Sequence, residues 1–485
     1  IVSFLLTLVI YKANKILRPP KHLRHIPHLS FIGVLFSLIT KKGYKHFAKE
    51  KTIPMINSPE SKGLYLKPGR HGWVINVSDP VALRTILMKH DFFPRKDITT
   101  GLENSLFLKF AGVHNMLLIG GERSKIQRKI AIPVFRRSMP VKLFGRLTQD
   151  LFHVIDSTGE IVNVLDLMYR FTLETIGLAG FGFEFNAILN KNSEWVVNFE
   201  SVKNGTMDPF FYLFPAFDKK KYLWMFPKRK QIHKDTDKFL AMLDKVIENK
   251  RNEMKSGKIY SDVLDDNEKD ILTFMIEAEE TEGKMTDIEL KSNMCLFFLA
   301  GHDTSAISLS SAIYYLAKHP DIQERARQSA IDILGDEPED ILPNCEQTKQ
   351  MKYINQIIKE TLRLSVPTPQ GLPRLVTEDT VLAGVHIPKG SLVSPNMNDV
   401  HHNCKKWKNP FEFDPDRFDE SKNSTKSAKE GLYWAPFLYG YRQCIGMDFA
   451  FHQQQVVLSM ILRKYTFSLP ENSIHKDGLV TEGTL

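Results

Sequence analysis

A cysteine in the stretch FLYGYRQCIG, Cys444, is flanked by residue types that suit a metal ligand. Cysteine binds metal as the thiolate, so such a site must favour the anion of a thiol whose free pKa is about 8.5. Residues 447–465 have helical periodicity, which places this cysteine just before a helix N-terminus. The free N–H groups and the positive dipole end at that position favour a negatively charged sulfur. The pattern therefore predicts a thiolate ligand.

The neighbours of this cysteine make room and supply charge. Gly440 and Gly446 carry no side chain, which permits an unusual turn and the close approach of a flat cofactor. Arg442 stands two residues before the cysteine and could bind a carboxylate in a fork. A lone cysteine in a glycine-containing loop is more often a small buried side chain. The combined spacing favours the ligand instead.

A second group of reactive side chains lies in AGHDT, residues 300–304. It falls inside a helix predicted from Asp287 to Lys318, about 48 Å long, which a Thr286–Glu289 capping box starts. The glycine and the threonine of this stretch are unfavourable inside a helix, so we expect a local interaction that compensates for the lost helix stability. A hydroxyl beside the Asp303 carboxylate could relay protons. The alternative is that Thr304 bonds back to the preceding turn.

A third constellation places Glu360 and Arg363 three residues apart on a helix that ends near Pro367. This spacing puts both side chains on one face of the helix and predicts an ion pair. Such pairs are common and contribute little on a surface. By itself the pair indicates no function.

Five residues of the opening stretch spell F-x-x-G-x-R-x-C-x-G: Phe437, Gly440, Arg442, Cys444 and Gly446. This pattern resembles the haem-binding signature of the cytochrome P450 superfamily. The resemblance implies that Cys444 is the axial thiolate ligand of haem b (iron protoporphyrin IX), with Phe437, Arg442 and Gly446 as further cofactor-binding residues. Leu438 departs from the family, in which a small residue is common at this position.

The other two constellations also resemble motifs of this superfamily. AGHDT is similar to the oxygen-activation groove of its monooxygenase members, which implies catalytic roles for Asp303 and Thr304. In the family an E-x-x-R pair joins an arginine of a P-E-R-F-like motif, and DPDRF supplies Arg417. The resemblance implies that Glu360, Arg363 and Arg417 form a buried lock that supports the cysteine loop.

Two further arginines match family positions that bind haem propionates. Arg128, in GGERSKIQRKIAIPVF, matches the arginine of a W-x-x-x-R helix, and Arg374, in GLPRLVTEDT, matches a strand arginine. Ser124 stands where the tryptophan is usual, so one propionate or packing contact is missing. We expect this to affect haem affinity and not the fold. Lys125 and Lys129 on the same helix could present charge to a reductase or form a solvated face.

Cysteine usage and charge narrow the class of protein. The four cysteines form no C-x-x-C pair, which argues against a disulfide framework or a structural zinc site. A metal site at His401, His402 and Cys404 is disfavoured because no second ligand pair accompanies them, and His302 is assigned to packing or to a helix surface. The net charge is +9, but the chain has no arginine-rich tract interleaved with aromatics. A membrane surface or an acidic protein is therefore favoured over nucleic acid as the binding partner.

The chain predicts a mainly α fold with a smaller β region (α+β), arranged as one large domain with a long central helix, and the resemblance implies that this is a haem domain. A strand followed by a helix is expected at residues 72–90, and short strands at 380–395. An irregular segment is expected at 97–118. Long amphipathic helices are expected across 120–330.

The N-terminus predicts a membrane anchor. Residues 1–18 combine an uncharged apolar run with following basic residues and predict the remnant of an anchor, with a cleaved signal peptide as the alternative. Residues 19–485 are assigned to the haem-thiolate catalytic domain, whose C-terminus ends early for the family. Residues 208–230 alternate aromatics with lysines, which suits a buried helix pair or a membrane surface equally.

The resemblance implies a haem-thiolate monooxygenase that inserts one oxygen atom of O2 into a small apolar substrate. The implied partner is an NADPH-dependent cytochrome reductase, with cytochrome b5 as a second candidate. The chain is most similar to fungal microsomal members, which implies the endoplasmic reticulum membrane, with the catalytic domain facing the cytosol. The alternatives are an isomerase or dehydratase acting on peroxides without a reductase, oxidative coupling of tyrosine-type aromatics, and a non-catalytic haem-binding protein.

Overall fold

The computed structural model describes residues 17–39, 44–69, 71–100, 102, 104–136, 139–206, 208, 210–211, 214–257, 269–280, 285–421 and 431–480. Contacts divide the chain into two compact units. The first contains the described parts of residues 1–96, 362–444 and 477–485, and the second those of 97–361 and 445–476. The proposed anchor at residues 1–18 lies almost wholly outside the described residues. Within the described ranges, no helix combines the length and the apolar composition needed to cross a bilayer.

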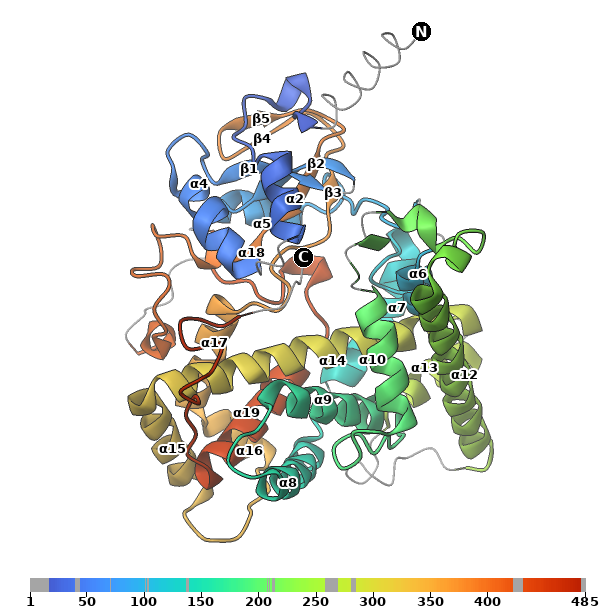
Figure 1. Ribbon diagram of the computed structural model, residues 1–485, viewed down its shortest axis with the longest axis vertical. Helices are drawn as coiled ribbons and strands as arrows, with labels where there is room; N and C mark the ends of the chain where they lie inside the picture. Colours follow the sequence, from blue (N-terminus) through green and yellow to red (C-terminus); the bar gives the residue numbers. More distant parts are fainter. Residues whose placement is uncertain are drawn as a thin grey trace. The chain divides into compact units, whose positions relative to one another are not determined.

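The first unit is built on a small mixed sheet (Figure 1). Its strand order is β1-β2-β6-β3, with β1 (Leu64–Gly69) antiparallel to β2 (Gly72–Val77), β6 (Leu392–Pro395) parallel to β2, and β3 (Arg374–Leu375) antiparallel to β6. A separate hairpin pairs β4 (Thr380–Leu382) with β5 (Val385–Ile387). The strands expected at residues 72–90 and 380–395 are therefore confirmed.

Short helices surround this sheet. The expected helix after β2 is α5 (Pro80–Met88), whose first turn is capped by the Asp79 carboxylate, which accepts from the backbone N–H groups of Val81 and Ala82. The other helical segments are η1 (Lys21–Leu23), α2 (Phe31–Ile39), α3 (Tyr44–Phe47), η2 (Ala48–Thr52), α4 (Ile53–Asn57), α18 (Met397–His401), η5 (Pro415–Phe418) and η7 (Gly440–Arg442).

The second unit is helical, as the periodicity across residues 120–330 predicts. Its long helices are α7 (Gly121–Arg136), α8 (Val141–Thr158), α9 (Val164–Phe181), α10 (Glu194–Thr206), α12 (Pro227–Lys255), α13 (Ile271–Glu280), α14 (Asp287–Lys318), α15 (Pro320–Leu334) and α19 (Met447–Lys464). Shorter elements are α6 (Leu106–Ala111), η3 (Pro215–Asp218), η4 (Leu223–Met225) and α16 (Cys345–Gln350). Helix α17 (Lys352–Leu364) begins in the second unit and ends in the first.

Helix α14 has the boundaries that the sequence predicts. Its 32 residues begin with the predicted capping box, in which the Thr286 hydroxyl accepts from Glu289 N–H and the Glu289 carboxylate accepts from Thr286 N–H. It packs along α9, and Figure 1 shows the two helices side by side. Phe298 of α14 lies in an aromatic core with Phe181 and Phe239. This core fixes the helix that carries AGHDT.

The segment expected to be irregular, residues 97–118, contains a helix, α6. The Ser105 hydroxyl caps it by accepting from Leu108 N–H. A carboxylate oxygen of Asp218, distant in the sequence, accepts from Leu106 N–H at 3.2 Å. The prediction was wrong over these six residues because part of the capping comes from a tertiary contact.

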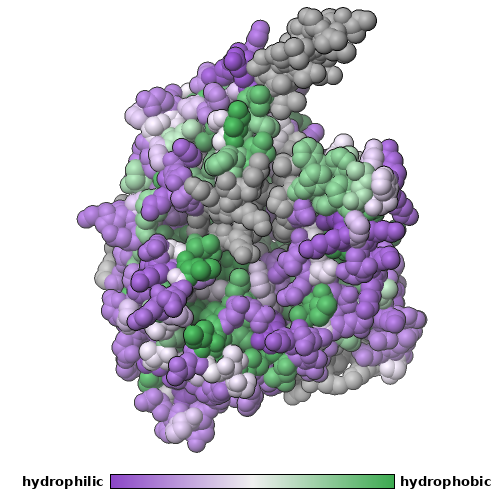
Figure 2. Space-filling view, viewed as in Figure 1, coloured by the Kyte–Doolittle hydropathy of each residue, from purple (hydrophilic) through white to green (hydrophobic). Residues whose placement is uncertain are grey.

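In its described residues, the aromatic segment at 208–230 contains the short helices η3 and η4 and the start of α12, and several of its aromatic side chains are exposed rather than buried in a helix pair. Its inner side is held by a salt bridge from the Arg229 guanidinium to the Asp218 carboxylate, at 2.6 Å for each N–O pair. Its outer side exposes 51% of Phe214 and 73% of Trp224. Hydrophobic side chains gather at the surface over this segment (Figure 2). The segment therefore joins a charged interior to an apolar exterior.

Replacement of Asp218 by asparagine should destabilise the second unit. The Arg229 guanidinium would stay buried without its counter-ion, and we expect the free energy of unfolding to fall by about 3 kcal/mol or more. Burial alone would raise the pKa of Asp218, but hydrogen bonds from Arg229 and His233 lower it to about 2.

A carboxyl group whose folded pKa is lowered stabilises the protein above its ordinary pKa of 3.8 and loses that contribution as the pH falls towards 2. Urea unfolding between pH 6 and pH 2.5 should therefore show a wild-type stability loss that Asp218→Asn lacks. Asp237→Asn is the matched control, because its partner is the partly exposed Lys109 on the surface. Equal losses in both variants would contradict the prediction.

Candidate functional site

The cysteine loop of the first unit is a tight turn that ends just before α19. The backbone N–H of Cys444 donates to the Phe437 carbonyl at 2.9 Å, and that of Gln443 donates to the Gly440 carbonyl at 3.0 Å. Cys444 is exposed and forms no disulfide. Helix α19 begins at Met447 with Gly446 as its N-cap, so the predicted place of the cysteine is confirmed.

Two residues of the loop have left-handed backbone conformations. Gly440 has φ +72°, and a Cβ atom added there would lie 3.2 Å from both the Leu87 carbonyl oxygen and the Met88 sulfur. Leu438 has φ +60°, which a residue with a side chain seldom adopts. The departure from a small residue at this position therefore carries backbone strain. The turn depends on Gly440 for both conformation and space.

Two buried arginines lie close together in the first unit. Arg374 is 2% exposed and is positioned by strand β3, which pairs with β6, while Arg442 closes η7. Burial, and then the positive charge of Arg442, lowers the pKa of Arg374 to about 10. One arm of Arg374 donates to the Phe93 carbonyl at 3.2 Å, and among the described residues its buried Nε has no hydrogen-bond partner. Like charges buried together favour an anionic ligand, so this pair fits a carboxylate-bearing molecule.

The residues of the predicted lock, Glu360, Arg363 and Arg417, lie on α17 and η5. Glu360 and Arg363 are both fully buried on α17. The Arg363 guanidinium donates to three carbonyl oxygens, those of His401 (2.9 Å), Pro410 (2.7 Å) and Glu412 (3.1 Å). Arg417 donates to the neighbouring Asn409 carbonyl at 3.0 Å. Two of the three predicted residues therefore hold the same segment of the first unit.

His401 connects this segment to the cysteine loop. Its buried Nε2 accepts a hydrogen bond from Ala435 N–H at 3.0 Å, a contact that sequence reasoning missed. Its neighbour Cys404 contacts Asn57. No group of three or more metal-ligating side chains is found in the described parts of the chain. His401 therefore acts as a backbone support.

In the second unit, AGHDT forms part of the continuous helix α14. The Thr304 hydroxyl donates to the Ala300 carbonyl at 2.6 Å, which is the back-bonding alternative that the sequence left open. A Cβ atom on Gly301 would lie 3.2 Å from Ile176 of α9, so the glycine allows close helix packing. His302 is 3% exposed and contacts Thr172 and Phe199, which confirms its assignment to packing.

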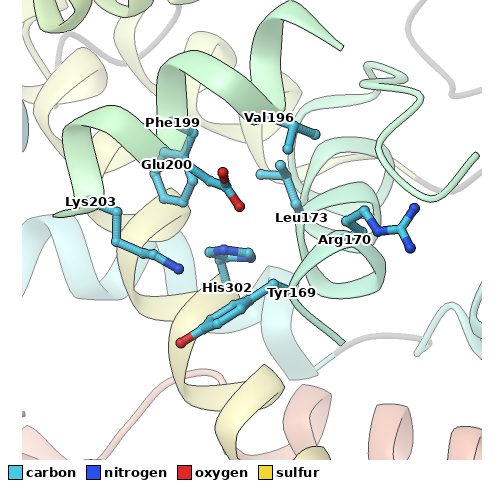
Figure 3. A pocket seen from close by; sticks show the side chains of 8 residues that line it. All are labelled: Tyr169, Arg170, Leu173, Val196, Phe199, Glu200, Lys203 and His302. Atoms are coloured by element: carbon cyan, nitrogen blue, oxygen red, sulfur yellow. The ribbon is translucent and has the colours of Figure 1, made fainter. Parts of the chain in front are cut away.

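Asp303 has a cationic neighbour that the sequence did not reveal. The Lys203 ammonium of α10 lies 3.8 Å from the Asp303 carboxylate and 3.5 Å from the centre of the Tyr169 ring on α9. Burial raises the pKa of Asp303, and Lys203 opposes that rise. Lys203, Tyr169 and His302 line a small cleft in the second unit (Figure 3). No local motif marks Lys203, since it stands one hundred positions before its partner.

Helix α7 carries Arg128 half-buried and Ser124 fully buried. The Ser124 hydroxyl donates to the Met116 carbonyl at 3.3 Å, and Met116 N–H donates to the Asn293 side chain of α14 at 2.9 Å. The position where a tryptophan is usual therefore holds a small residue bonded to backbone. Lys125 forms a surface pair with Glu122 at 3.1 Å.

A cysteine loop before a helix N-terminus, two neighbouring buried arginines and an acid beside an alcohol on a long helix are therefore all present where the sequence predicts them. The chain belongs to the cytochrome P450 family, whose model, described as Cytochrome P450, matches residues 62–481. It is therefore a cytochrome P450 monooxygenase, an oxidoreductase of a family that binds haem b through a cysteine thiolate.

Known proteins support this assignment. The chain is 29% identical over 436 residues to cytochrome P450 3A5 of Homo sapiens, and the matched region covers 85% of this chain and 80% of that protein. It is 32% identical over 318 residues to bifunctional cytochrome P450/NADPH–P450 reductase 1 of Bacillus subtilis (strain 168), over 65% of this chain and 28% of that protein. The crystal structure of the cytochrome P450DA heme domain has the same fold, with a TM-score of 0.74, 23% identity and coverage of 94% and 92%.

Gly440→Ala should disturb the cysteine loop. The added Cβ atom meets backbone at 3.2 Å and also takes up a left-handed conformation, so we expect a loss of about 1–2 kcal/mol in the free energy of unfolding and lower haem content. Gly390→Ala is the matched control in the same unit, because Gly390 has φ +83° but nothing within 4 Å of the added atom. Haem per protein should fall in the first variant alone; equal haem content in both would contradict the role of Gly440.

Proposed function

We propose that this chain is a haem-thiolate monooxygenase that inserts one oxygen atom of O2 into an apolar organic substrate with electrons from a partner reductase. The observation that carries the proposal is the buried Arg374–Arg442 pair, because it supplies two neighbouring cations for the two carboxylates of haem b, next to an exposed cysteine. When bound, the haem supplies the electron-transfer and oxygen-activating chemistry.

Each site residue receives a role. Cys444 is assigned as the axial thiolate, and the dipole of α19 and the free N–H groups at its first turn stabilise that negative charge. Arg442 and Arg374 are assigned to the propionates, together with Arg128, whose assignment rests on its motif alone. The Phe437 carbonyl accepts a hydrogen bond from Cys444 N–H and orients the loop, and Gly446 is the N-cap residue of α19.

Glu360, Arg363 and Arg417 are assigned as structural support. Arg363 and Arg417 together donate to four backbone carbonyl groups. One of these carbonyls belongs to His401, whose ring also accepts a hydrogen bond from Ala435 N–H. The cysteine loop begins two residues later, so the support is indirect. A charged donor buried among carbonyl acceptors is a strong hydrogen-bonding arrangement.

Asp303 and Thr304 are assigned to proton delivery. Burial raises the pKa of the Asp303 carboxyl group, so it holds its proton to higher pH than a free carboxyl group and can serve first as an acid and then as a base. The Thr304 hydroxyl, which donates to Ala300 in this structure, can rotate to pass a proton onward. The two neighbours therefore have the chemistry of a relay.

The electron donor and the location are proposed from the relatives and from charge. The relatives named as bifunctional P450/NADPH–P450 reductases contain both activities in one chain, and we propose that a separate NADPH-dependent reductase serves this one, with cytochrome b5 as a second donor. The net charge of +9 suits an acidic partner. The apolar run at residues 1–11 and the exposed aromatics near Trp224 support a place on the endoplasmic reticulum membrane.

Cys444→Ala tests the ligand assignment. We expect the wild-type protein to show the ferrous–CO absorption band of thiolate ligation and the variant to lack it, because alanine provides no ligand atom. Cys404→Ala is the matched control, since Cys404 is also exposed but contacts Asn57. If Cys444→Ala kept the band with its fold retained, as judged by circular dichroism, the assignment would be wrong.

The reaction class is tested with a purified NADPH-dependent cytochrome reductase. We expect spectral shifts with at least one of lauric acid, ergosterol and 7-ethoxycoumarin, and NADPH consumption that depends on both the reductase and that compound. Consumption of an organic hydroperoxide without NADPH would instead favour the isomerase or dehydratase. A thiolate CO band with no turnover in either assay would favour the non-catalytic haem-binding protein.

A further inference from the structure

The cleft of the second unit connects a buried acid to a nearly buried amine. Lys203 projects from α10 and Asp303 from α14, and their side chains are 14% and 17% exposed. The two charged atoms lie 3.8 Å apart, too far for a hydrogen bond and close enough for strong attraction at low dielectric. The buried Oδ1 atom of Asp303 has no hydrogen-bond partner within the described chain. Its charge is therefore balanced mainly through space.

Lys203 is held in place by an aromatic ring as well as by charge. Its ammonium lies 3.5 Å from the centre of the Tyr169 ring, which is short for a cation–π contact. Figure 3 shows the Lys203 amine pointing towards the Tyr169 ring and His302. A lysine with two such partners loses much of its freedom. It can act as a fixed positive charge beside the acid.

The other charged groups around the cleft do not supply the positive charge that Lys203 places beside Asp303. On α9, Arg170 lies 3.1 Å from Asp166, donates to the Ile188 carbonyl and points away from the cleft. On α14, burial lowers the pKa of His302 well below its ordinary value, so this ring is neutral at pH 7. Glu200 of α10 adds a negative charge near Lys203. Lys203 is therefore the cation of this cleft that faces Asp303.

We propose that Lys203 is a positioning residue for proton delivery, which keeps the Asp303 carboxylate ionised and oriented after it has given up its proton. This inference rests on the monooxygenase function proposed above. Asp303 in its acid form releases a proton towards Thr304 and becomes a carboxylate. It is then reprotonated from bulk solvent, with water at the cleft passing one proton in as it receives another, and Lys203 keeps its own charge throughout.

The electrostatics support this division of roles. Burial raises the pKa of Asp303 and Lys203 opposes that rise, so the amine makes the acid more ready to release its proton. Burial lowers the pKa of Lys203, and Asp303, Glu200 and Asp166 raise it. Without the ammonium, the buried acid would stay protonated to higher pH. Proton release would then become slow.

Four variants test the inference: Lys203→Met removes the charge, Lys203→Arg retains it, Asp303→Asn removes the acid, and Lys238→Met is the control. Lys238 suits this purpose because it also joins α12 to an acid of α10, Glu194, but both side chains are more than half exposed. Lys203→Gln is made as well, in case methionine impairs folding. Far-UV circular dichroism establishes which variants fold.

The first readout is stability against pH, which requires no turnover. An acid whose folded pKa is raised stabilises the protein below its ordinary pKa of 3.8 and loses that contribution as the pH rises through the folded pKa. In Lys203→Met the midpoint of this loss should move upward by about one pH unit or more, because an opposite charge has been removed. Lys203→Arg should restore the wild-type midpoint, and Lys238→Met should keep it. The phase should be absent from Asp303→Asn.

The second readout is the fate of electrons in the reductase assay with 7-ethoxycoumarin. Slow proton delivery should raise the fraction of NADPH electrons recovered as hydrogen peroxide in Lys203→Met, by about tenfold if one pH unit of acidity is lost. The ferrous–CO band should be unchanged. If Lys203→Met and wild type share both the stability midpoint and the peroxide fraction, the inference is overturned. A wild type without reductase-dependent turnover would overturn the proposed function, while the stability midpoint would still decide the Lys203–Asp303 coupling.

Discussion

The packing of α14 against α9 is the contact on which the second unit depends. It is close because α14 carries a glycine where it meets α9: a Cβ atom on Gly301 would lie 3.2 Å from Ile176. Interiors are packed as tightly as organic crystals, so a side chain at residue 301 would have to separate the helices or displace the isoleucine. Either change would move Asp303, two positions further along, relative to α9 and its Tyr169 ring. The helix stability lost at Gly301 is therefore offset by the correct placement of the Asp303 carboxyl group.

The two units balance charge in opposite ways. In the first, Arg374 and Arg442 are buried near each other, and the Nε atom of Arg374 has no partner among the described residues. In the second, the buried Asp303 already has its cation in Lys203. Buried like charges with an unsatisfied Arg374 Nε atom suit an anionic ligand, whereas a buried acid beside a cation already has its charge balanced within the protein.

Much of the fold could be predicted because its signals are local. The capping box at Thr286 and the long periodicity after it give both ends of α14, and the β-branched run after Gly72 gives a strand. The cysteine loop was predicted from fixed spacing. By contrast, part of the capping of α6 comes from Asp218, and the cation beside Asp303 stands on another helix. Contacts of this kind depend on how helices pack, and no pattern within one segment encodes them.

Ser124 illustrates how a departure from a motif can be absorbed. A tryptophan would fill space and offer an indole N–H, whereas the buried serine donates to the Met116 carbonyl. The adjoining chain is then held by α14, because Asn293 accepts from Met116 N–H and donates to Gln127 of α7. Polar bonds have replaced aromatic packing as the means of fixing α7.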